Sequence, residues 1–151
     1  MRSALGLEFV EAESDDLELL VSLRISAMKP SLVMLGRFDP DRARARFADS
    51  FNPGNTTKIY LSGEFVGFYV LTEHIDHVVI DHLYVKPGQQ GFGIGAAVLE
   101  RIKCKAISRK KPICVGALKK SQSNSFYKRH GFVKTHEGEW DIYYSWAIVD
   151  C

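Results

Sequence analysis

A glycine-rich segment between a strand-like run and a helical pattern constrains the fold of this chain most. Residues Val78 to Val85 are rich in β-branched side chains, and residues 86–91 form a loop rich in Gly and Gln. From about Phe92 to Arg109 apolar residues recur at helical spacing, and a short apolar run follows at Ile113 to Ala117. A strand, a helix and a second strand in this order predict a parallel crossover within one sheet.

The remaining segments predict mainly antiparallel neighbours for that crossover. Ser14 is expected to cap a first helix that Pro30 ends, and Asp39-Pro40 is expected to start a second. The other expected elements are strands at Leu7–Ala12, Lys58–Leu61, Phe65–Leu71, Phe132–His136 and Trp140–Ile148, and helices at Asp41–Ser50 and Ser121–His130. We therefore predict one α/β (α+β) domain over residues 1–151, with a mixed, mostly antiparallel sheet of about seven strands and four helices on both faces.

The glycine loop has the chemistry of an anion site. Glycines before a helix expose backbone N–H groups, and the helix dipole adds positive potential, so this position favours phosphate. Gly91, Gly93 and Ala96 also match a dinucleotide fingerprint, but residues 110–115 lack the acidic residue which that fold needs about 20 positions on. A P-loop is excluded because no Gly-Lys-Ser/Thr follows. A purely structural glycine turn stays open as an alternative.

Two motifs in the right order resemble the GNAT superfamily of N-acetyltransferases. Residues 90–95, Gln-Gly-Phe-Gly-Ile-Gly, resemble its Gln/Arg-x-x-Gly-x-Gly/Ala loop, and residues 83–87 resemble the strand that leads into that loop. Residues 125–132 resemble the helix that ends in Phe-Tyr-x-x-x-Gly-Phe, and the element order is similar over nearly the whole chain. The resemblance implies direct transfer of an acetyl group from acetyl-CoA to a primary amine in a ternary complex. The alternative is a non-catalytic acyl-CoA-binding module on the same fold.

The resemblance also assigns residues to the acetyl-CoA site. Tyr127 corresponds to the tyrosine that protonates the departing thiolate as general acid, although a core tyrosine is the alternative. The cofactor-binding residues implied are Leu83, Tyr84, Val85, Gln90, Gly91, Phe92, Gly93, Ile94, Gly95, Ala96, Ser123 and Tyr127. Main-chain groups of Leu83 and Val85 would hold the pantetheine arm and the thioester oxygen. Lys120 departs from the Asn that many members have for a pantetheine contact, and the nearby Asn124 is an alternative.

An attacking amine needs a proton acceptor, and His82 is the first candidate. Its imidazole ordinarily titrates near neutrality, which suits general-base catalysis. Asp81 is adjacent and therefore points to the opposite face of the strand. Glu73 on the preceding strand is a second candidate, and the alternative for His82 is a packing or capping role.

The acceptor amine itself is not identified by the sequence. Residues 1–85 carry 8 basic and 13 acidic side chains, whereas residues 86–151 carry 12 and 5, a distribution that suits an anionic donor and a cationic acceptor but is equally expected by chance. The resemblance implies that the segment from Arg24 to Phe38 contacts the acceptor, and its apolar residues, from Met28 onward, line an acceptor pocket or belong to the core. A net charge of +2 argues against a dedicated nucleic-acid binder.

Cysteine usage and hydropathy bound the cellular context. Three cysteines without a pairing or Cys/His pattern predict a reduced, cytoplasmic protein with no metal site. The acidic N-terminus is unlike a signal peptide, and no apolar stretch approaches 18 residues, so we expect no membrane association. The aromatic residues Tyr143, Tyr144 and Trp146 make the last strand a candidate homodimer contact.

Overall fold

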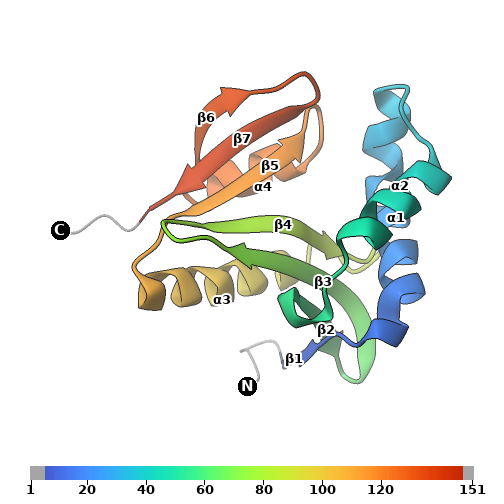
Figure 1. The fold of residues 1–151 in the computed structure, drawn as a ribbon, viewed down its shortest axis with the longest axis horizontal. Coiled ribbons are helices and arrows are strands. Elements are labelled where there is room, and N and C mark those ends of the chain that lie inside the picture. The colour runs from blue at the N-terminus through green and yellow to red at the C-terminus, as the bar shows by residue number, and fades with distance from the viewer. Residues whose placement is uncertain (1–5, 148–151) are drawn as a thin grey trace. The chain divides into compact units, whose positions relative to one another are not determined.

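A seven-stranded sheet with strand order β1-β2-β3-β4-β5-β7-β6 forms the fold (Figure 1). The structure is a computed structural model, and it describes residues 6–147. The strands are β1 Leu7–Glu11, β2 Thr56–Leu61, β3 Glu64–Glu73, β4 Val78–Val85, β5 Ile113–Leu118, β6 Val133–Glu137 and β7 Asp141–Trp146. The helices are α1 Leu17–Met34, α2 Pro40–Ser50, α3 Ile94–Arg109 and α4 Ser123–Arg129, with short 3₁₀ turns at Ser14–Asp16 and Pro53–Asn55.

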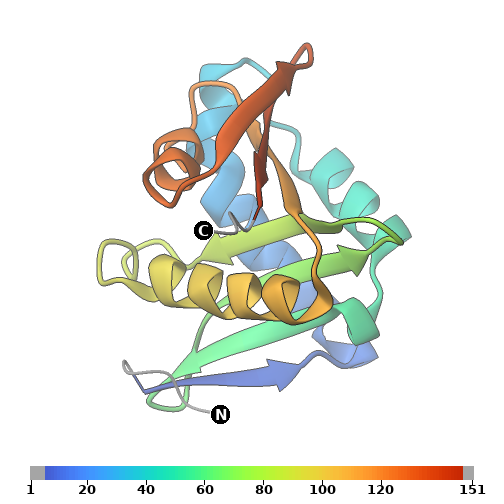
Figure 2. The ribbon, with the colours of Figure 1, turned by 90° about the vertical axis from the view of Figure 1, so that its left-hand side faces the viewer.

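The strand pairing is mixed and mostly antiparallel, which confirms the predicted fold class. The pairs β1–β2, β2–β3, β5–β7 and β6–β7 are antiparallel, and the run from β1 to β3 can be followed in Figure 2. The pair β4–β5 is parallel, with Val78–Ile80 opposite Ile113–Val115. Helix α3 connects these two strands, as the crossover prediction required.

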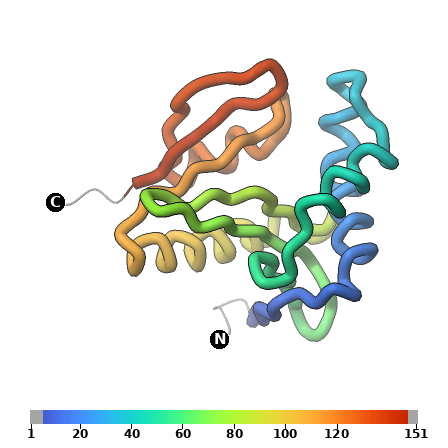
Figure 3. The backbone as a smooth tube through the Cα atoms, viewed as in Figure 1, coloured from blue at the N-terminus to red at the C-terminus, as the bar shows by residue number. Residues whose placement is uncertain are grey.

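The chain divides into two compact units. The first contains the residues up to Val70 and His82–Ala97, and the second contains Leu71–Asp81 and the residues from Val98 onward. In the first unit α2 turns back along α1 (Figure 3), and their apolar faces form a core with Phe68 of β3. In the second unit the fully buried side chains include Val98 and Ile102 of α3 and Tyr144 of β7.

Helix α1 differs from the sequence prediction at both ends. Pro30 lies inside the helix, which continues to Met34, so the predicted end was wrong. Proline removes the hydrogen bond to the carbonyl of Ser26 and crowds that carbonyl, but Ser26 is exposed, so the carbonyl can tilt outward and be hydrated. At the start, Ser14 belongs to a 3₁₀ turn in which the Glu13 N–H donates to Asp16 Oδ2 at 2.8 Å, and α1 begins at Leu17.

Three further features can be compared with the sequence predictions only within the described residues: membrane-spanning helices, cysteines and the last strand. Among residues 6–147 no helix is both long enough and apolar enough to cross a bilayer. Cys104 and Cys114 are free thiols, and Cys151 lies outside the described residues. The last predicted strand is observed as Asp141–Trp146, while its predicted end, Ile148, lies outside the described residues.

Candidate active site

The glycine loop between β4 and α3 is open and lined by backbone. Gly88, Gly91 and Gly93 have φ values of +93°, +86° and +84°, a region that favours glycine. These residues are exposed, and a Cβ added at Gly88 or Gly91 would meet nothing within 4 Å. The conformation delays the start of α3 to Ile94, two residues after the predicted start.

The first turn of α3 presents its amides beside this loop. The helix begins its hydrogen bonding with Ala97 N donating to Gly93 O at 3.0 Å. The N–H groups of residues 94–96 therefore precede the first intrahelical bond and have no acceptor within the helix. Ile94 is 2% exposed and anchors the turn in the core. Exposed glycines followed by amides that have no acceptor within the helix, at the positive end of a 16-residue helix, fit a phosphate-bearing group.

The loop is fastened to the end of β4 by side-chain and backbone bonds. Gln90, which the sequence predicts to bind acetyl-CoA, uses its side chain to support the loop: its Nε2 donates to Val85 O at 3.0 Å. Lys86 N donates to Val66 O at 2.7 Å, and Gln89 N donates to Lys86 O at 2.9 Å. These bonds mark the boundary between β4 and the glycine loop.

The last residues of β4 alternate between two faces. His82 and Tyr84 face the core formed by α1, α2 and β3, with ring centroids 5.1 Å from Phe47 for His82 and 5.5 Å from Phe68 for Tyr84. On β3, Gly67 allows the neighbouring backbone to approach, because a Cβ there would lie 2.4 Å from Tyr84 O. Leu83 and Val85 alternate with these residues and are partly buried.

His82 is held by a short chain of polar contacts. Its Nδ1 lies 3.0 Å from Tyr84 Oη, and Tyr84 Oη donates to Met28 Sδ at 3.2 Å. In the tautomer that lets the Tyr84 hydroxyl donate to the Met28 sulfur, Nδ1 of a neutral His82 carries the ring proton. Nε2 is then the acceptor nitrogen of the imidazole.

The expectation that His82 titrates near neutrality was wrong. Burial, and secondly the positive charge of Arg24, lower the pKa of His82 from 6.5 to about 4. The imidazole is therefore neutral at pH 7. Sequence reasoning placed His82 on a strand, but it could not show that Phe47 of α2 packs against the ring or that the charge of Arg24 on α1 acts on it.

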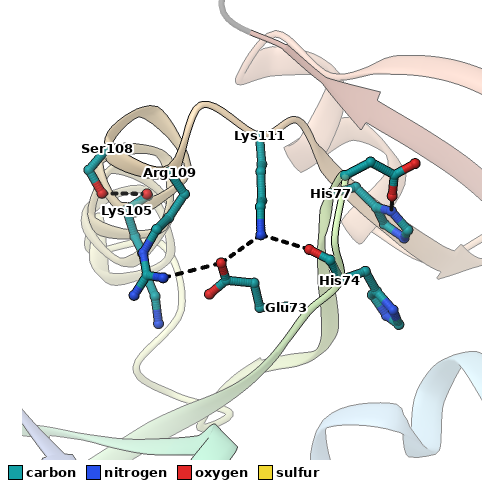
Figure 4. A network of polar contacts seen from close by, with 8 residues as sticks. Glu73, His74, His77, Lys105, Ser108, Arg109 and Lys111 are labelled. Carbon is teal, nitrogen blue, oxygen red and sulfur yellow. Dashed lines mark hydrogen bonds and ion pairs between the residues drawn. The ribbon is translucent and has the colours of Figure 1, made fainter.

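Asp81 and Glu73, the other candidate bases, are engaged elsewhere, both in the second unit. Asp81 is exposed and accepts a hydrogen bond from the Thr72 hydroxyl. Glu73 Oε2 accepts from Lys111 Nζ at 2.7 Å and from Arg109 Nη1 at 3.2 Å (Figure 4). The hydrogen bond from Lys111, aided by the charge of Arg109, holds the pKa of Glu73 below its usual range. Glu73 is thus an ion-pair partner and a poor base.

Tyr127 lies in the second unit, on α4, and is 5% exposed. Its ring centroid lies 5.2 Å from Phe126, 5.3 Å from Phe132 and 6.3 Å from Tyr144. Its carbonyl accepts bonds from the amides of His130 and Phe132 where the helix ends. The motif around Tyr127 therefore has a clear structural role, and its catalytic role stays a prediction.

Residues 54–134 match the family model of the acetyltransferase (GNAT) domain, which is more than half of the chain. The chain belongs to the GNAT acetyltransferase family. Comparison with curated proteins gives no match.

Solved structures share the GNAT fold over nearly the full length of this chain. The PaiA N-acetyltransferase of Thermoplasma acidophilum, in complex with coenzyme A, is 16% identical with a TM-score of 0.76, covering 94% of this chain and 99% of its own. An acetyltransferase of Thermus thermophilus is 15% identical with a TM-score of 0.74, covering 94% and 97%. The ribosomal-protein-S18-alanine N-acetyltransferase of Escherichia coli is 16% identical with a TM-score of 0.66, covering 95% and 96%.

The departure from the GNAT pattern at Lys120 has a structural consequence. Lys120 has a φ of +69°, a conformation in which Asn is tolerated better than Lys. Asn124 does not replace the missing amide, because Nδ2 donates to Leu118 O at 2.9 Å and to Ser121 O at 3.0 Å, while Oδ1 accepts from Tyr144 Oη at 2.8 Å. Ser123 is exposed at the first position of α4.

Arg24 is the residue near His82 that sequence reasoning missed as part of this GNAT site. The sequence placed Arg24 at the start of the segment expected to contact the acceptor, but it assigned no role to the Arg24 side chain. Its Nη1 donates to Ala43 O of α2 at 2.6 Å, and its Nε is buried without a partner among residues 6–147. Within the same described residues, no group of three or more His, Cys, Asp or Glu is arranged to hold a metal ion.

Proposed function

We propose that this GNAT protein transfers the acetyl group of acetyl-CoA to a primary amine by direct attack within a ternary complex. The glycine loop and the first turn of α3 carry the proposal. Their exposed backbone donors match an anionic pyrophosphate, and the loop sequence is that of the family. The complex of the Thermoplasma acidophilum structure with coenzyme A supports the choice of donor.

In this proposal the end of β4 holds the thioester. The parallel ladder between β4 and β5 comprises Val78–Ile80 and Ile113–Val115, and Leu83 to Val85 follow it. Main-chain groups of Leu83 and Val85 would bind the pantetheine arm, and an amide there would stabilise the negative charge that develops on the carbonyl oxygen. Gln90, through Val85, keeps the loop in register with this strand.

His82 would accept the amine proton through Nε2. Its lowered pKa makes it a weak base at rest, so the amine is expected to attack from its neutral form while hydrogen-bonded to the imidazole. Tyr127 would return a proton to the thiolate of CoA. The family motif supports that role, although the ring is buried among aromatic neighbours.

Two measurements test the proposal. Isothermal titration with acetyl-CoA should show binding, and a thiol-release assay with an amine panel should show turnover. No binding at millimolar acetyl-CoA would overturn the proposal, whereas binding without thiol release from any amine would support the non-catalytic module instead.

The general-acid assignment has its own test. Replacing Tyr127 with Phe should lower kcat by about 100-fold or more, because general acids contribute roughly that much, while acetyl-CoA affinity is retained. Full turnover by the folded Tyr127→Phe enzyme would leave Tyr127 as a core residue only.

A further inference from the structure

Arg24 is a partly buried cation that forms no ion pair with the residues from 6 to 147, and its Nε is fully buried. Its guanidinium is fixed from one side, where Nη1 donates to Ala43 O at 2.6 Å. Nε is shielded from water and has no partner among residues 6–147. A charged donor left unpaired in this way lowers stability, and such a group in a native protein requires an explanation.

The acidic side chains at the start of α1 do not supply that counter-ion. Glu18 pairs with Arg44 at the exposed surface, and Asp16 pairs with Lys58 at 2.9 Å. None of the ion pairs formed within residues 6–147 involves Arg24. These two pairs occupy Glu18 and Asp16, and they leave Arg24 without a carboxylate partner among the residues that the structure describes.

Arg24 and His82 both pack against α2: Arg24 Nη1 donates to Ala43 O at 2.6 Å, and the His82 ring centroid lies 5.1 Å from that of Phe47, one helical turn after Ala43. At this position the charge of Arg24 acts on the imidazole. An amine that gives its proton to His82 must come within hydrogen-bond reach of the ring. Such an acceptor therefore binds within the electric field of the Arg24 guanidinium. A second ammonium group on the acceptor is repelled there, and a carboxylate is attracted.

We propose that Arg24 selects acceptor amines that also carry a carboxylate, such as a free amino acid or an acidic peptide, over simple amines and polyamines. The inference rests on the proposed function, because it assumes that the amine attacks beside His82. A guanidinium edge with Nε and one Nη matches a carboxylate through two parallel hydrogen bonds. Because Nε is covered, binding requires a local side-chain rearrangement of the kind common at binding sites.

Carboxylate binding would also change His82. Neutralising the charge of Arg24 removes one of the two causes that lower the pKa of His82, so the imidazole becomes a better base when the right acceptor is present. Acceptor recognition and amine activation are then linked through one side chain.

The test compares matched acceptors on matched variants. Leucine is compared with isoamylamine and lysine with cadaverine, so that each pair differs by the carboxylate. Acidic dipeptides and their fully amidated forms distinguish a peptide acceptor from a free amino acid. Arg24→Gln removes the positive charge, and Arg24→Lys keeps the charge but lacks the two parallel N–H donors of the guanidinium. Arg44→Gln, which removes an exposed contact between α1 and α2, is the control. Thermal melts establish that each variant is folded.

The wild type should favour the carboxylated member by about 10- to 100-fold in kcat/KM, the range of one charge-assisted contact. Arg24→Gln should bring that ratio near one, with the KM for acetyl-CoA unchanged; Arg24→Lys should retain part of it and Arg44→Gln all of it. A wild type without carboxylate preference, or an Arg24→Gln loss equal for both members, would overturn the inference.

Absence of thiol release from every amine would refute the proposed function, and carboxylate binding then decides the inference separately. Isovalerate, which has no amine, should shift the NMR signals of the His82 ring in the wild type and in Arg44→Gln but not in folded Arg24→Gln. No shift in the wild type would overturn carboxylate recognition.

Discussion

The glycine loop and the cluster of Arg24, His82 and Tyr84 are both reached from β4, yet they are built in different ways. The loop consists of exposed backbone in a conformation that glycine permits, with donors from the first turn of α3. The cluster consists of partly buried side chains from α1 and β4, packed on Phe47 of α2. The loop depends on local backbone geometry, and the cluster depends on tertiary packing. In the proposed function the loop would bind the acetyl donor and the cluster would meet the acceptor.

The largest expected effect is a loss of stability in acid, which tests how tightly His82 is packed in the cluster. The folded-state pKa of His82, about 4, lies below the unfolded value of 6.5, so the unfolded chain binds a proton that the folded chain excludes between these pH values. Stability is fully present above pH 6.5 and falls by about 3 kcal/mol as the pH drops to 4.

Denaturant unfolding at several pH values, for the wild type and for His82→Gln, isolates this contribution. The difference in free energy of unfolding between the two proteins should change between pH 7 and pH 4. A difference that stays constant over this range would mean that His82 is hydrated and not packed as described.

A Gly67→Ala variant tests the close approach of β3 to the end of β4, the strand from which both the loop and the cluster are reached. An alanine Cβ there would lie 2.4 Å from Tyr84 O and 3.4 Å from Val85 Cα, both backbone atoms that cannot move independently. We expect Gly67→Ala to lower stability by about 2 kcal/mol, as overpacking does, and to weaken acetyl-CoA binding as well.

Gly116→Ala is the matched control for Gly67→Ala. The added Cβ would lie 2.9 Å from Cε1 of the Tyr143 ring, and a side chain can move aside. Its loss of stability in thermal unfolding should be smaller. Equal losses for the two variants would contradict the close approach of β3 to the end of β4.

Sequence reasoning reached the loop and not the cluster for physical reasons. The bounds of β4 and the glycine conformations depend on neighbouring residues, so they could be predicted. The pKa of His82 and the role of Arg24 depend on contacts with α1 and α2, and the Arg24–Ala43 bond alone spans 19 positions. The prediction that Pro30 ends α1 was wrong because the free-energy cost of a proline inside a helix depends on whether the residue four positions earlier, Ser26, is exposed. The local sequence does not reveal that exposure.

The smallest expected effect is a gain in stability from a substitution at Lys120, which tests how backbone conformation constrains residue choice. It occupies φ +69° without being glycine, so Lys120→Asn should raise stability by about 0.5–1 kcal/mol. Denaturant unfolding measures the gain, and Lys119→Asn, one residue earlier on the same turn, serves as the control. No gain at position 120 would weaken the argument that positive φ selects residues in this protein.

The central claim is that the backbone of the glycine loop holds acetyl-CoA. Isothermal titration of the wild type against Gly93→Val tests it most directly, because valine at φ +84° is strained and places a branched side chain in the cradle. Gly36→Val carries the same strain at φ +69° in the α1–α2 connection and serves as the control. We predict that Gly93→Val weakens acetyl-CoA binding by about 100-fold, or about 2.7 kcal/mol, while Gly36→Val leaves it unchanged. Equal affinity of folded Gly93→Val and wild type would contradict the account.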